Sequence, residues 1–62
     1  PIHLTTHSGQ EFDFILSGSL KVQIGEHTEI LHEGDSIYFD ATRKHCMHAL
    51  GDKPVKFLCI VD

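Results

Sequence analysis

Hydrophobic and polar residues alternate along most of this chain, in short runs that are separated by turn-forming residues. The run at residues 20–24, Leu-Lys-Val-Gln-Ile, alternates strictly, which is typical of a strand with one buried face. Similar short runs, rich in β-branched and aromatic residues, predict further strands at residues 11–16, 28–32, 36–39, 45–50 and 55–61. Residues 1–7 indicate an additional extended segment at the start. No segment sustains the period of a helix.

The connections between these runs carry glycine, serine, aspartate and proline. We expect turns at residues 17–19, 25–27, 33–35 and 51–54 and a loop at 40–44, with Gly34 at a positive φ. Many short strands with turns between them predict an all-β fold, a small antiparallel barrel or jelly roll. Because a chain this short does not readily form a closed barrel alone, we expect upstream strands or a dimer partner to complete the barrel.

The chain length and the net charge limit the number of domains and the kinds of partner that this segment can bind. Its 62 residues allow one domain, residues 1–62, and the structured start suggests the C-terminal part of a longer chain. The net charge of −4 repels phosphate, so we expect no direct contact of this segment with nucleic acid. No apolar run is long enough to cross a membrane and no signal peptide is visible, which favours a cytoplasmic protein.

The cysteines and the common catalytic motifs add little. Cys46 and Cys59 are too few for a four-cysteine zinc site, and two buried reduced thiols are the simplest interpretation. No nucleophile elbow, P-loop or dinucleotide fingerprint occurs. We therefore assign no catalytic residue.

Histidine and glutamate provide the candidate chemistry. His7 and Glu11 lie four residues apart, and His45 follows the strand predicted at residues 36–39. Two imidazoles and one carboxylate can bind Zn, Fe, Mn or Ni and leave positions open for water or substrate. The alternative is a polar pocket that holds an organic ligand through hydrogen bonds without a metal, and the sequence leaves both possibilities open.

The same residues resemble the two motifs of the cupin family. His7, Glu11 and Gly18 have the spacing of the latter part of the first motif, and Gly34, Asp40, Thr42, His45 and Ala49 have the spacing of the second. The resemblance implies a β-barrel in which His7, Glu11 and His45 are metal ligands. The chain departs from the motifs at four positions: Thr5 replaces a ligand histidine, Asp40 and Thr42 replace proline and glycine, and Ala49 replaces asparagine.

Within that family, the stretches around Glu11 and at residues 34–39 resemble the C-terminal cupin sensor domain of bacterial helix-turn-helix transcription regulators. This resemblance implies a small-molecule-sensing homodimer that reaches DNA only through an upstream domain. The alternative is a small metal-dependent enzyme of the dioxygenase or isomerase type.

The alternation of side chains along each strand assigns the neighbours of these residues. Asp13 shares a face with Glu11, and Met47 and Ala49 share a face with His45, whereas His48 points away. We predict a ligand pocket lined by Thr5, Asp13, Tyr38, Met47 and Ala49. The predicted core or pocket residues are Ile15, Leu20, Val22, Ile24, Tyr38, Phe57 and Cys59, whereas His27, in a hairpin loop, and His32 are expected to be exposed.

Overall fold

The fold is built from strands alone in the part of the chain that the computed structural model describes, residues 8–62. The strands are β1 (Gln10–Ser17), β2 (Leu20–Ile24), β3 (His27–Leu31), β4 (Ser36–Asp40), β5 (His45–Ala49) and β6 (Lys56–Val61). The predicted all-β class and the predicted strands from residue 11 onward are confirmed, with ends that agree or differ by one residue. The extended segment predicted at residues 1–7 lies outside the described residues.

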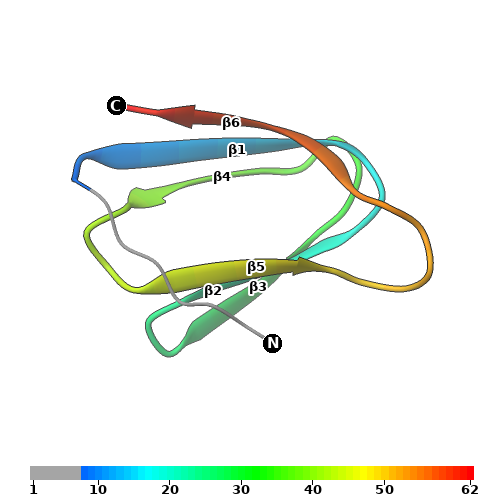
Figure 1. The fold of residues 1–62 in the computed structure, drawn as a ribbon, viewed down its shortest axis with the longest axis horizontal. Coiled ribbons are helices and arrows are strands. Elements are labelled where there is room, and N and C mark those ends of the chain that lie inside the picture. The colour runs from blue at the N-terminus through cyan, green and yellow to red at the C-terminus, as the bar shows by residue number, and fades with distance from the viewer. Residues whose placement is uncertain (1–7) are drawn as a thin grey trace.

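Two three-stranded antiparallel sheets face each other (Figure 1), one in the order β4-β1-β6 and the other in the order β3-β2-β5. The chain crosses between the sheets after β1, β3, β4 and β5, and within residues 8–62 only the β2–β3 hairpin joins two strands of one sheet. This order is consistent with the predicted jelly-roll arrangement. It places residues that are distant in sequence on the two inner faces.

The hydrophobic core fills the space between the sheets. Alternate residues of β1 and β2 are buried, as the period of two predicts. The core consists of Ile15, Leu20, Val22, Ile24, Leu31, Phe39 and Ala41, with Ile37, Met47, Val55 and Phe57 packed against it. The predicted burial of Ile15, Leu20, Val22 and Ile24 is confirmed.

Three predictions about individual positions are wrong in detail. Tyr38 is 67% exposed, because Ile37 and Phe39 take the inward positions of β4. Cys59 is exposed, because it lies on β6, a strand at the edge of its sheet. His27 is the first residue of β3 and pairs with Ile24, so the hairpin turn has two residues rather than three, although His27 is exposed as expected.

Large apolar side chains are exposed on this molecule. They are Leu16, Ile30, Tyr38, Leu58, Ile60 and Val61. The homodimer stays a prediction.

Among residues 8–62 there is no helix long and apolar enough to cross a membrane.

Two glycines illustrate different requirements of the backbone. Gly34 has the predicted positive φ, 87°, and open space around the position of a Cβ atom. Gly9 also has a positive φ, 90°, but a Cβ atom there would lie 2.2 Å from the main-chain oxygen of Asp62. Gly9 therefore allows the entry to β1 to pass close to the end of the chain.

This difference predicts unequal costs for two identical substitutions. Gly34→Ala is expected to lower the free energy of unfolding by about 1–2 kcal/mol through the left-handed backbone alone. Gly9→Ala is expected to cost at least about 1 kcal/mol more, since a clash with main chain forces the backbone to shift. Urea unfolding measures both, and equal losses would contradict the close approach of Gly9 and Asp62.

Candidate functional site

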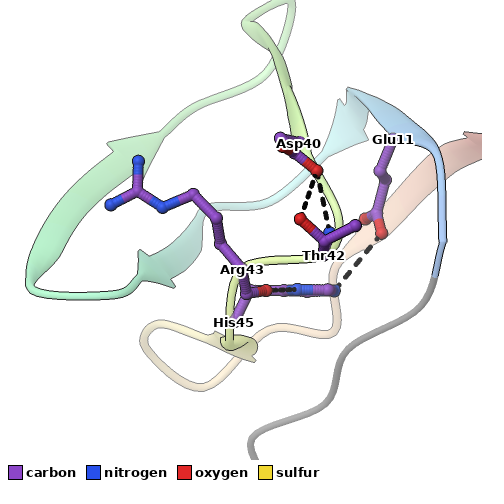
Figure 2. A network of polar contacts seen from close by, with 5 residues as sticks. All are labelled: Glu11, Asp40, Thr42, Arg43 and His45. Carbon is purple, nitrogen blue, oxygen red and sulfur yellow. Dashed lines mark hydrogen bonds and ion pairs between the residues drawn. The ribbon is translucent and has the colours of Figure 1, made fainter.

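A carboxylate and an imidazole from opposite sheets meet inside the molecule (Figure 2). Glu11 is the second residue of β1, and His45 is the first residue of β5. Both side chains are buried, and His45 Nε2 lies 3.5 Å from Glu11 Oε1. The fold thus brings together two of the three residues that the sequence analysis selected, whereas His7 lies outside the described residues.

A main-chain contact fixes the His45 ring. His45 Nδ1 lies 2.8 Å from the carbonyl oxygen of Arg43, and the Phe39 ring packs edge-on against the imidazole with the centroids 4.9 Å apart. A carbonyl oxygen can only accept a hydrogen bond, so Nδ1 carries the proton. In the neutral ring, the lone pair of Nε2 then faces the carboxylate of Glu11. These two atoms can share a proton or bind one cation together.

The loop before β5 places that carbonyl group. Asp40 Oδ1 accepts hydrogen bonds from the Thr42 main-chain N–H at 3.0 Å and from the Thr42 hydroxyl at 2.7 Å. These bonds hold the pKa of the Asp40 carboxyl below its ordinary value, and the bond from the Thr42 hydroxyl has the largest effect. Asp40 and Thr42 occupy the positions at which the cupin motif has proline and glycine. In this chain, hydrogen bonds between the Asp40 side chain and Thr42 stabilise the turn in place of the proline and the glycine.

A second carboxylate and a thiol lie beside Glu11. Asp13 is completely buried on the inner face of β1 and pairs across the sheet with Cys59 of β6. Desolvation of the thiol, together with hydrogen bonds to the carboxylates of Asp13 and Glu11 and their negative charge, raises the pKa of Cys59 to about 12. The thiol is therefore protonated at neutral pH when only these carboxylates surround it.

A cleft of about 450 Å³ opens between the two sheets, along the edge strands β3 and β4. Its volume is within the range of small-molecule sites. Apolar side chains form part of its walls, and charged and polar side chains form the rest. The lining residues are Ile24, His27, Glu29, Leu31, Ser36, Ile37, Tyr38, Phe39, Asp40 and Arg43.

Two residues connect this cleft with the Glu11–His45 pair. Phe39 lines the cleft and touches the His45 ring. Arg43 also lines the cleft, and its carbonyl group accepts the hydrogen bond from His45 Nδ1. Figure 2 shows the Arg43 side chain pointing away from His45, and its guanidinium group lies near Gly25 of the β2–β3 turn.

The predicted pocket residues lie in different surroundings. Tyr38 lines the cleft, whereas Asp13, Met47 and Ala49 are not among the cleft residues, and Thr5 lies outside the described part of the chain. Met47 packs against the core, and Ala49 is exposed at the end of β5. The predicted common face of His45, Met47 and Ala49 is confirmed, since they pair with the inward residues of β2 and His48 does not.

Three contributions were missed by the sequence analysis. These are the Arg43 carbonyl group, the Phe39 ring and the position of Cys59 beside Asp13. The alternation of β6 indicated which residues share a face with Cys59. No local signal indicated that β6 pairs with β1.

Comparison with known proteins identifies a family. A protein-family model described as a cupin domain matches residues 1–61. No curated protein and no solved structure matches the chain significantly.

Proposed function

The chain belongs to the cupin family, and from that premise we propose that it is a small-molecule-sensing domain whose site holds a divalent transition-metal ion through His45 and Glu11. His7 is the third ligand in this proposal, on the strength of the motif it shares with Glu11. When bound, the ion acts as a Lewis acid, and its open coordination positions can accept an oxygen or nitrogen donor of the small molecule.

The observation that carries the proposal is the orientation of His45 toward Glu11. Metal-binding histidines usually donate their other ring N–H to a carbonyl or carboxylate group, as Nδ1 does here. The separation of 3.5 Å between Nε2 and Oε1 exceeds the length of a charge-assisted hydrogen bond, about 2.7–2.9 Å. Two donors on one tetrahedral ion, with bonds of about 2.1 Å, lie about 3.4 Å apart. The pair therefore fits a shared ion better than a direct hydrogen bond.

The cleft supports the sensing part of the proposal. Its volume and mixed lining suit a small organic molecule with an apolar body and polar ends. Because Phe39 and Arg43 contact both the cleft and His45, a ligand that moves either residue changes the surroundings of the imidazole. Such a ligand produces a signal only if it binds one conformation more tightly than another. Control of transcription through an upstream DNA-binding domain stays a prediction.

The experiment that tests this proposal is elemental analysis of the chain, purified without chelator or affinity nickel. We expect near-stoichiometric metal in the wild type and a loss of about tenfold or more in His45→Ala, which removes a ligand. His48→Ala is the matched control, since His48 lies on the same strand but on its opposite face.

Either of two outcomes would contradict the metal site. One is a wild-type chain that contains no metal and takes up none when Zn, Fe, Mn and Ni are supplied. The other is metal that remains undiminished in His45→Ala while circular dichroism shows that the variant is folded.

A further inference from the structure

Three ionisable side chains converge beside the Glu11–His45 pair, on the inner face of the β4-β1-β6 sheet. Glu11 and Asp13 are two residues apart on β1, so their side chains point to the same side. Cys59 of β6 lies directly across from Asp13. One donor atom from each of the three residues lies within 4.8 Å of the other two.

This cluster differs from a surface group of acidic residues in its burial. Asp13 is 0% exposed and Glu11 is 4% exposed, so both carboxylates lie in a region of low dielectric constant. Two buried carboxylates this close together present oxygen donors that converge on one point. A divalent cation placed between them takes carboxylate oxygens in place of water ligands, and its charge balances theirs.

The Cys59 thiol adds a sulfur ligand to the cluster and lies on the path by which an ion can enter from solvent. Cys59 is exposed on an edge strand, so an ion can reach the buried carboxylates from solvent along its side. Sγ loses its proton to solvent when it binds a metal ion, and a metal–thiolate bond forms in place of the S–H bond. In a tetrahedral site an oxygen and a sulfur donor lie about 3.6 Å apart, so donor atoms that lie within 4.8 Å of one another draw together by up to about 1.2 Å when the ion binds.

We propose that Glu11, Asp13 and Cys59 form a second metal site, which takes an ion that accepts both thiolate and carboxylate ligands, such as Zn²⁺ or Co²⁺. The site goes beyond the proposed function and shares only Glu11 with it, whose two carboxylate oxygens can serve two neighbouring ions. It requires neither His45 nor His7.

The test is a titration of the reduced, metal-free full chain with Co²⁺, followed by absorption spectroscopy. Thiolate ligation gives a near-ultraviolet sulfur-to-cobalt charge-transfer band, which carboxylate and imidazole ligands do not give. We expect this band in the wild type, its loss in Cys59→Ser, and its retention in Cys46→Ser, the matched control for the other cysteine. Asp13→Asn is expected to weaken the cobalt affinity read from the band by about tenfold or more.

The outcomes distinguish this site from the one formed by Glu11 and His45. A band that persists in His45→Ala supports the second site whether or not the first binds metal. Cobalt that binds without a charge-transfer band in the wild type overturns the second site and leaves the first intact. A band that survives in Cys59→Ser, with circular dichroism unchanged, also overturns the proposal.

Discussion

Adding Zn²⁺ to the metal-free chain, at about 100 times its dissociation constant, is expected to raise the melting temperature by about 10–20 °C. A ligand that binds only the folded state stabilises it by about 2.7 kcal/mol at this concentration. In a domain of about this size, each 1 kcal/mol shifts the melting temperature by about 4–8 °C. The effect is large because a small domain has little stability of its own.

Glu11→Gln is the variant that examines this effect most sharply. Glu11 belongs to both proposed metal sites, and the amide of glutamine has a similar shape but no charge. We expect the zinc-dependent shift of the melting temperature, measured against the variant's own metal-free form, to fall to near zero. Glu33→Gln, an exposed glutamate, is the control and is expected to keep the full shift. A full shift in Glu11→Gln, reversed by chelator as in the wild type, would contradict a metal site at Glu11.

Ile15→Ala is expected to lower the free energy of unfolding by about 2–5 kcal/mol. Ile15 is completely buried at the centre of the core, where β1 packs against the opposite sheet. The substitution removes buried apolar surface and leaves a cavity that the two rigid sheets fill only in part. A domain of this length has a total stability of about 3–9 kcal/mol, so the variant is expected to be marginal or unfolded.

Ile30→Ala provides a control with the same chemical change. Ile30 lies on β3 and is 45% exposed, so its truncation is expected to cost no more than about 0.5 kcal/mol. Urea unfolding, monitored by circular dichroism, compares the two variants with the wild type. Similar losses in both variants would show that Ile15 does not lie in the core as the structure has it.

The local pattern was sufficient for much of the fold. The strict alternation at residues 20–24 correctly predicted both the bounds of β2 and the burial of Leu20, Val22 and Ile24. It was misleading at Tyr38, since an aromatic residue in a short strand suits either face and only the packing of Ile37 and Phe39 decides between them. At His27, the pattern did not separate a three-residue loop from a two-residue turn, because hydrogen-bond pairing with Ile24 sets that boundary.

The sequence likewise predicted some features of the candidate site and not others. The spacing of Glu11 and His45 selected the two residues that the structure brings to within 3.5 Å of each other. The spacing carried no information on the carbonyl group that orients the ring, because the turn made by Asp40 and Thr42 differs from the proline and glycine of the motif.

By itself, the sequence determined which residues form strands and which side chains share a face, because alternation is a local property of an extended backbone. It also determined the cupin family and the carboxylate and imidazole that belong to its motifs. Only the tertiary structure decided that β6 pairs with β1 and places Cys59 beside Asp13, and that Phe39 and Arg43 join the cleft to His45. These contacts depend on the order of strands within each sheet, which arises from packing between distant segments and leaves no local trace in the chain.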